Sequence, residues 1–147
     1  MRATNISTSF VIDASVTLPW CFEDERTSFT ESLLNRIRAH ETGMVPSHWP
    51  AEILNSLVQA KKRGRVSEDI LQRFLKDLNS FPILIDDERA LMIWERIRTL
   101  SEIHQLTAYD AAYLELAQRY KLPLATLDRD LQNAARAEKV PLLTDAA

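Results

Sequence analysis

Short apolar runs rich in β-branched residues alternate with longer helical patterns along the chain, and this alternation constrains the fold more than any other feature. Each run has only three to five residues, and an unbroken apolar run of this length is typical of a strand buried on both faces. Strands separated by helices pair in parallel. We therefore predict a three-layer α/β domain whose central parallel sheet has about five strands, at residues 9–13, 44–46, 82–85, 123–127 and 140–143.

Six segments between these strands carry apolar residues at helical spacing. Pro50 suits the first turn of one helix, and Gly64 ends it. Ser67 and the acids that follow it begin the next helix. The predicted helices are residues 26–40, 50–63, 67–79, 88–103, 108–120 and 128–139.

The length of 147 residues is enough for one domain with its own core, and 46% hydrophobic with 27% charged residues is an ordinary globular composition. We expect a single domain over residues 1–147, with a polar lead-in at 1–8 and a tail at 144–147. No segment approaches the ~20 apolar residues of a membrane span, and polar residues interrupt any secretory signal at the start. The lone Cys21 suits a reducing compartment, so we expect a cytoplasmic protein.

Composition also excludes several kinds of site. Two glycines are too few for a dinucleotide-binding fingerprint or a P-loop. The three histidines and the one cysteine are too widely spaced for a zinc motif. The net charge of −3, from 18 bases and 21 acids, argues against a broad electrostatic grip on nucleic acid. Any contact with nucleic acid must therefore come from local charge or from a bound metal.

Three acids lie where predicted strands end. Asp13 ends the first strand, Glu52 lies in the first turn of the helix after the second, and Asp128 begins the helix after the fourth. Because the carboxyl ends of parallel strands share one edge of the sheet, connectivity brings these three side chains toward one another. Asp110 begins a helix that follows another helix, so topology alone does not locate it.

Each of these acids also has an ordinary structural role to weigh. Asp128 can cap its helix, Asp110 can complete a capping box with Thr107, and Glu52 can complement a helix dipole. For each of these three, considered singly, the structural role is favoured. Asp13 differs, because a carboxylate at the end of a buried strand loses its hydration unless it meets a cation or hydrogen-bond donors. Function is favoured at Asp13.

Converging carboxylates indicate a particular chemistry. They repel one another, so at least one stays protonated unless a cation is bound between them. Hard oxygen ligands without histidine or cysteine favour Mg²⁺ or Mn²⁺ over zinc. Such a site suits hydrolysis of a phosphodiester by a metal-activated water, which needs no side-chain nucleophile.

Four short motifs resemble those of the PIN-domain nucleases, and specifically the VapC-type ribonuclease toxins of type II toxin–antitoxin systems. The motifs are Val11–Ser15, Pro50–Asn55, Thr107–Tyr113 and Leu124–Asp128. Each motif is weak alone, but four in the correct order and spacing make a specific pattern, and the resemblance extends from Phe10 to Leu143.

The resemblance implies that Asp13, Glu52, Asp110 and Asp128 form a catalytic, metal-binding quartet with Mg²⁺ or Mn²⁺ as the cofactor. It implies a metal-dependent endoribonuclease that acts as a toxin on RNA. It also implies a cognate antitoxin, whose tail blocks the acidic groove, and homodimerisation through apolar helical faces. The alternatives are a PIN nuclease of RNA processing that is not a toxin, and a catalytically silent PIN-like binding module.

The resemblance further suggests supporting residues around the quartet. The hydroxyls of Ser15 and Thr126 are placed to orient carboxylates or metal-bound waters, although satisfying backbone groups at strand ends is an equally good explanation. Asn55 lies one helical turn after Glu52, on the same face, and can contribute an amide there.

Three further features are less specific. Asp130 points about 200° away from Asp128 on a helix, so we favour Asp128 as the metal ligand and assign Asp130 to first-turn electrostatics. His48 and Trp49 directly precede the Glu52 helix and are expected to border the substrate groove. A basic cluster either forms a solvated helix end or contacts the RNA backbone, the first being favoured; it comprises Lys61, Lys62, Arg63 and Arg65.

Overall fold

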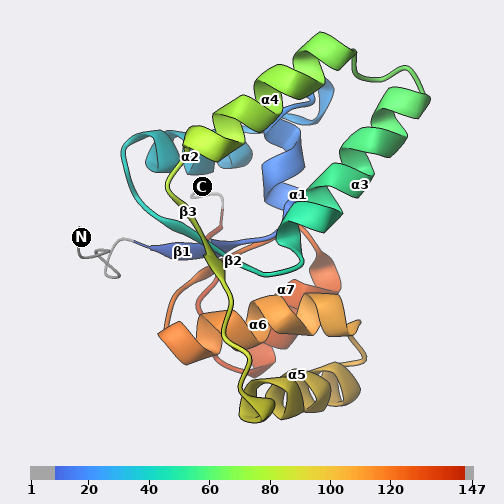
Figure 1. The fold of residues 1–147 in the computed structure, drawn as a ribbon. Coiled ribbons are helices and arrows are strands. Elements are labelled where there is room, and N and C mark those ends of the chain that lie inside the picture. Colours follow the sequence, from blue (N-terminus) through green and yellow to red (C-terminus); the bar gives the residue numbers. More distant parts are fainter. Residues whose placement is uncertain (1–8, 145–147) are drawn as a thin grey trace.

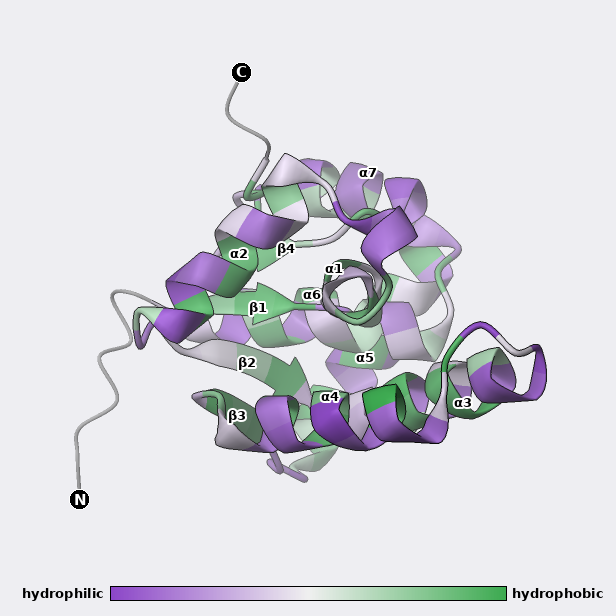
Figure 2. Cartoon of the chain, turned by 90° about the horizontal axis from the view of Figure 1, so that it is seen from above, coloured by the Kyte–Doolittle hydropathy of each residue, from purple (hydrophilic) through white to green (hydrophobic). Residues whose placement is uncertain are grey.

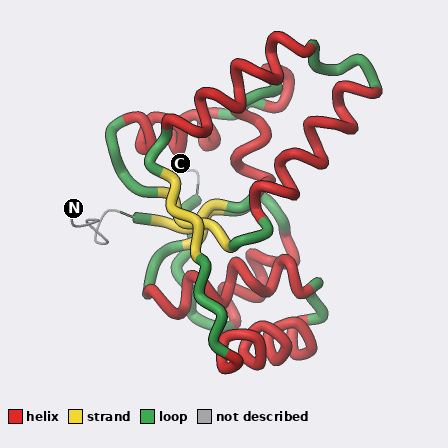
Figure 3. The backbone as a smooth tube through the Cα atoms, in the orientation of Figure 1, coloured by secondary structure: helices red, strands yellow, loops and turns green. Residues whose placement is uncertain are grey.

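A parallel four-stranded sheet lies at the centre of the molecule in the computed structural model, which describes residues 9–144 (Figures 1 and 3). The strand order is β3-β2-β1-β4, and every pairing is parallel. The strands are β1 (Phe10–Ile12), β2 (Gly43–Pro46), β3 (Ile83–Asp86) and β4 (Leu124–Ala125). The first strand of the chain therefore lies inside the sheet, and its carboxyl end is flanked by those of β2 and β4.

The prediction of a fifth strand at residues 140–143 is wrong. Only one bridge forms there, between Leu142 and Leu124. Pro141 has no backbone N–H to donate, and β4 itself spans only two residues, so the pairing does not extend into a ladder. The predicted polar lead-in at 1–8 and most of the predicted tail, residues 145–147, lie outside the described residues.

Helices cover both faces of the sheet, as the three-layer prediction requires. Figure 1 shows α2 and α4 on one side and α5, α6 and α7 on the other. The α-helices are α1 (Ala14–Thr17), α2 (Ser28–Arg38), α3 (Trp49–Lys62), α4 (Glu68–Ser80), α5 (Leu91–His104), α6 (Ala108–Tyr120) and α7 (Arg129–Ala137), with 3₁₀ turns η2 (Leu18–Trp20) and η3 (Glu23–Glu25). None of the helices in the described part of the chain is both long and apolar enough to cross a membrane.

The core is built around β1 and α6. All three residues of β1 are fully buried, and α6 packs against β1, β2 and β4. Figure 2 shows this apolar centre in green, with hydrophilic residues on the surrounding helices. Gly43 allows α2 to lie close to the sheet, because a Cβ there would meet Ile12 and Ile37 at 3.2 Å. Each fully buried Leu, Ile or Phe contributes roughly 1.5–3 kcal/mol.

Local signals in the sequence determine where several helices begin and end. Thr27 forms a capping box with Thr30 at the start of α2, and Ser67 caps α4. Gly64, at φ +73°, permits the turn after α3 that sends the chain back along α4. The hairpin of α3 and α4 extends away from the sheet on the side where β1 ends (Figure 1).

Candidate active site

Asp13 directly follows β1 and is only 5% exposed. Its Oδ1 accepts hydrogen bonds from Ser15 Oγ at 2.6 Å and from the Val16 backbone N–H at 3.3 Å. Its Oδ2 accepts a hydrogen bond from the Thr126 hydroxyl. Burial raises the pKa of Asp13 to about 6, although these donors partly counteract it. Asp13 is therefore a buried acid that has donors but, among residues 9–144, no lysine or arginine partner.

The two hydroxyls that hold Asp13 also connect the ends of two strands. Ser15 Oγ accepts a hydrogen bond from the Leu127 N–H at 2.8 Å, and Thr126 Oγ1 accepts one from the Asp128 N–H at 3.0 Å. Both explanations offered for these hydroxyls thus apply, since each orients a carboxylate and satisfies a backbone group. Asp13 is consequently fixed relative to the segment that carries Asp128.

Glu52 lies in the first turn of α3, which follows β2. Its Oε1 accepts a hydrogen bond from the Tyr113 hydroxyl at 2.7 Å. His48 Nε2 lies 2.9 Å from the same oxygen, close enough for an ion pair, but the contact lacks hydrogen-bond geometry. Burial raises the pKa of Glu52, yet the contacts with His48 and Tyr113 outweigh it, so the net shift is downward. Glu52 is therefore held as a carboxylate in a fixed position.

Asp110 and Asp128 lie at the starts of two helices, in the structural roles considered for them. Thr107 caps α6 by accepting a hydrogen bond from the Asp110 N–H at 3.1 Å. Asp128 caps α7, its Oδ1 accepting a hydrogen bond from the Leu131 N–H at 2.9 Å. The pKa of Asp110 is raised by burial first, then by the negative charges of Asp128 and Glu52. Asp110 is thus close enough to both acids to sense them.

The four predicted acids consequently form one electrostatic cluster centred on Asp110, whose charge also raises the pKa of Asp13. In this conformation, no three His, Cys, Asp or Glu side chains among the described residues are close enough together to hold a metal ion. The donor set nevertheless fits a divalent cation, because hard carboxylate oxygens repel one another here. None of the four forms an ion pair with a lysine or arginine of residues 9–144.

The remaining predicted residues differ in their relation to this cluster. Asn55 is exposed on α3 and lines a groove that begins beside Ser15. Asp130 is exposed in the first turn of α7, and it makes no hydrogen bond or ion pair with the described residues. Its contribution to the site stays a prediction, as does that of Asn55.

Sequence reasoning assigned no role to Tyr113. Its side chain is fully buried, its hydroxyl binds Glu52, and its ring packs edge-on against His48 with centroids 5.3 Å apart. His48 was expected to border the substrate groove, but it contacts the acid directly. The available signal was helical spacing, since Tyr113 lies three residues after Asp110 and therefore on the same face of α6.

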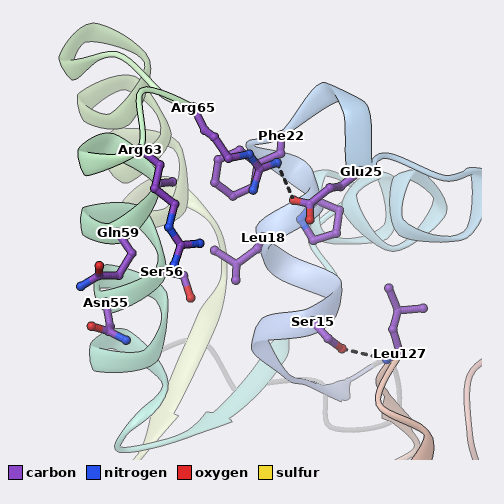
Figure 4. Close-up of a pocket in the computed structure, with 12 residues that line it drawn as sticks. Ser15, Leu18, Phe22, Glu25, Asn55, Ser56, Gln59, Arg63, Arg65 and Leu127 are labelled. Atoms are coloured by element: carbon purple, nitrogen blue, oxygen red, sulfur yellow. Dashed lines mark hydrogen bonds and ion pairs between the residues drawn. The ribbon is translucent and has the colours of Figure 1, made fainter.

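A groove of about 680 Å³ opens next to the acids, between α1 and α3. One end is formed by Ser15 and Leu127, so it begins one hydrogen bond away from Asp13. The other end is formed by Arg63 and Arg65 at the end of α3 (Figure 4). A groove with polar residues along α3 and apolar residues opposite them therefore leads away from the acidic cluster.

A parallel α/β sheet with carboxylates gathered at its carboxyl edge defines the class of α/β proteins that place their functional groups where the strands end. Comparison with known families is more specific, because the PIN domain model matches residues 10–137. The chain belongs to the PIN domain family.

Related proteins cover nearly the whole chain. A Pyrobaculum aerophilum protein named ribonuclease VapC3 is 29% identical over 133 residues, which is 90% of this chain and 95% of the relative. A Mycobacterium tuberculosis protein, also named ribonuclease VapC3, is 30% identical over 139 residues, which is 91% of this chain and 94% of the relative.

Solved structures share the fold. The crystal structure of PAE2754 from Pyrobaculum aerophilum has a TM-score of 0.69 at 22% identity, covering 90% of this chain and 87% of that one. The crystal structure of FitAcB from Neisseria gonorrhoeae has a TM-score of 0.56 at 18% identity, covering 92% and 96%. At these identities the likeness is one of fold.

Proposed function

We propose that this chain is a divalent-metal-dependent endoribonuclease that acts as the toxin of a toxin–antitoxin pair. The observation that carries the proposal is the electrostatic cluster of four acids centred on Asp110, with no lysine or arginine paired to any of them among residues 9–144. The two relatives named ribonuclease VapC3 support an RNA substrate and a toxin role, since both align over nearly their full length.

The roles of the residues follow from their contacts. Asp13, Glu52, Asp110 and Asp128 would hold Mg²⁺ or Mn²⁺, which supplies a Lewis acid and a water of lowered pKa at the phosphodiester. Ser15 and Thr126 keep the Asp13 carboxylate oriented into the site. Tyr113 and His48 hold the Glu52 carboxylate in place. These contacts restrict the side chains of Asp13 and Glu52, and a bound metal would draw the four carboxylates closer together than they lie in this conformation.

A matched pair of substitutions tests the site. Asp13→Asn keeps the shape of the side chain but removes a ligand charge, so we expect at least a hundredfold loss of Mg²⁺-dependent RNA cleavage. Asp130→Asn makes the same chemical change on an exposed residue and should retain activity within about threefold. Cleavage is followed with a labelled RNA, with a chelator as the metal-free control. Full activity in Asp13→Asn would refute the assignment, and equal losses in Asp130→Asn and Asp128→Asn would transfer the ligand role to Asp130.

Partners follow from the toxin proposal. We propose a cognate antitoxin whose arginine enters the acidic cluster, because a guanidinium pairs bidentately with carboxylate and can replace the metal's charge. The product of a neighbouring reading frame that co-purifies with this chain would identify it. If the antitoxin bound a variant with all four acids neutralised at unchanged affinity, the arginine mechanism would be excluded.

We also propose that the protein acts in the cytoplasm, because its single cysteine, Cys21, suits a reducing compartment.

The same experiments separate the two alternatives. A PIN nuclease of RNA processing would cleave RNA at the same acids but would have no inhibitory partner and would not arrest growth on expression. A silent binding module would bind RNA without cleaving it in any metal. The presence of all four acids supports a catalytic protein over a binding module that does not cleave RNA.

A further inference from the structure

We propose that Arg63 binds a phosphate of single-stranded RNA and so directs the strand along the groove between α1 and α3 into the acidic cluster. This inference rests on the proposed ribonuclease function, and it names a positioning residue outside the quartet. Arg63 belongs to the basic cluster at the end of α3, whose sequence fits either a solvated helix end or a contact with the RNA backbone.

The four cations of that cluster are not equivalent in the structure. Lys61 forms an ion pair with Glu68, and Arg65 pairs with Asp24 and Glu25. The guanidinium of Arg63 has no ion pair or hydrogen bond with the described residues, and only its backbone N–H is bonded, to the Gln59 carbonyl. Its charge is therefore available to a ligand.

Lys62 also lacks an ion pair among residues 9–144, but it does not line the groove. Arg63 does line it. Figure 4 shows its guanidinium reaching from α3 toward Leu18 on the far wall. Helical side chains lean toward the N-terminus of their helix, which here is the end that carries Glu52. Of the two free cations, only Arg63 faces the path to the acids.

The walls of the groove suit a single strand of RNA. The α3 wall is polar and places Asn55, Gln59 and Arg63 one turn apart, over about 12 Å at the helical rise of 1.5 Å per residue. Leu18 on the opposite wall and Leu127 at the acidic end are at least partly exposed and offer apolar surface to bases.

The charges in the groove favour an anion at the Arg63 end. Glu25 also lines the groove, but Arg65 lies 3.8 Å from it and stacks over Phe22 at 4.7 Å, which leaves Glu25 partly neutralised. At the other end Ser15 leads to Asp13, where a bound metal would attract another phosphate further along the same strand. A polyanion that extends from Arg63 to the metal meets favourable charge at both ends.

Binding is measured with a short fluorescent single-stranded RNA of mixed sequence, in the full-length Asp13→Asn background so that the probe stays intact. We expect Arg63→Gln to weaken binding roughly tenfold and to flatten the slope of log K against log salt by about 0.7, the loss of one phosphate contact. Lys62→Gln is the matched control, because it removes the same charge one residue away, and it should leave the slope unchanged. Arg63→Lys should restore the slope.

Cleavage by otherwise native protein provides the second readout. Arg63→Gln should raise KM about tenfold with kcat nearly unchanged, and its Tm should match that of the native protein, because Arg63 has no partner to lose. An unchanged slope and KM in Arg63→Gln, or equal effects of Lys62→Gln, would overturn the inference.

Two other experimental outcomes would point to a different occupant of the groove or to a different function of the chain. Lost binding of a co-purified partner protein, with RNA binding intact, would assign the groove to that protein and overturn the RNA proposal. Absence of RNA cleavage by the native chain in every divalent metal would instead contradict the proposed function itself.

Discussion

At the scale of single residues, burial of the Asp13 carboxyl lowers the stability of the folded protein when that carboxyl is ionised. The carboxylate is buried, and its pKa of about 6 lies above the ordinary 3.8 because burial disfavours the charged form. The folded protein therefore binds the proton more tightly than the unfolded chain does. Stability from this group is greatest below pH 4 and declines as the pH rises toward 6, by up to about 3 kcal/mol.

Neutralising Asp13 should reverse that loss. In the presence of a chelator, we expect Asp13→Asn to be more stable than the native protein at pH 7, by up to about 3 kcal/mol, and the difference to shrink at pH 4. Urea unfolding of both proteins at the two pH values measures it. Addition of Mg²⁺ should raise the Tm of the native protein and leave that of Asp13→Asn almost unchanged. A stability difference that stayed constant with pH would contradict this account.

Some residues of the candidate site can be predicted from the sequence, and others cannot. Asp13, Glu52 and Asp128 could be placed at one edge from strand order alone, but Asp110 needed the family resemblance. The Tyr113 contact with Glu52 joins residues 61 positions apart and depends on how α6 packs beneath β2. No pattern within one helix specifies such a contact, because the partner is chosen by tertiary packing.

Among the elements, α6 is attached to the edge strand β3 by a part-buried ion-pair network. Arg119 lies 2.6 Å from Asp86, the last residue of β3, and 2.9 Å from Glu115 on its own helix. Burial is the main reason why the pKa of Glu115 is raised. The same helix presents Asp110 and Tyr113, so this network helps fix the frame on which the site is built.

Removal of the shared cation should therefore destabilise the protein. We expect Arg119→Leu to cost about 2–3 kcal/mol, because Asp86 and Glu115 would face each other without a counter-ion. Arg98→Leu is the control, since Arg98 and Glu102 form an exposed pair on α5 whose loss should leave the free energy of unfolding nearly unchanged. Chemical denaturation compares the two, and similar small losses would show that the network contributes little.

The elements themselves were largely predictable. Each predicted helix is present with ends shifted by up to three residues, because the capping residues and apolar spacing are local signals. The prediction of a fifth strand is wrong because a strand forms only where a neighbouring strand pairs with it. Leu142 pairs with a single residue of β4, Leu124. The ion pairs that distinguish Arg63 from Lys61 likewise depend on where α4 lies.

At the scale of the whole molecule, α5 forms an outer layer with an apolar surface. Three large side chains in the first turn of this helix are more than half exposed: Leu91, Met92 and Trp94. Apolar residues so gathered on one element are typical of a surface that binds another protein. We propose that α5 is the helical face through which two copies of this chain associate.

A charge on that surface should separate the copies. Trp94→Glu, at a side chain that is 59% exposed, is expected to convert a dimer into a monomer without unfolding it, as measured by size-exclusion chromatography with light scattering. Ile70→Glu places the same charge on an exposed apolar residue of α4 and should remain dimeric. If only the α4 variant became monomeric, the interface would lie on α4 instead.

The bond between Asp13 and Thr126 joins residues 113 positions apart, and this has a consequence for the protein during its synthesis. A nascent chain that has not yet reached β4 contains Asp13 but neither the hydroxyl that orients its second oxygen nor Asp128. Arg63 and most of the groove would already have been translated, while Leu127 at the acidic end of the groove and Asp128 would still be missing. A ribosome making this chain would therefore be exposed to a finished nuclease only when translation of the domain is almost over.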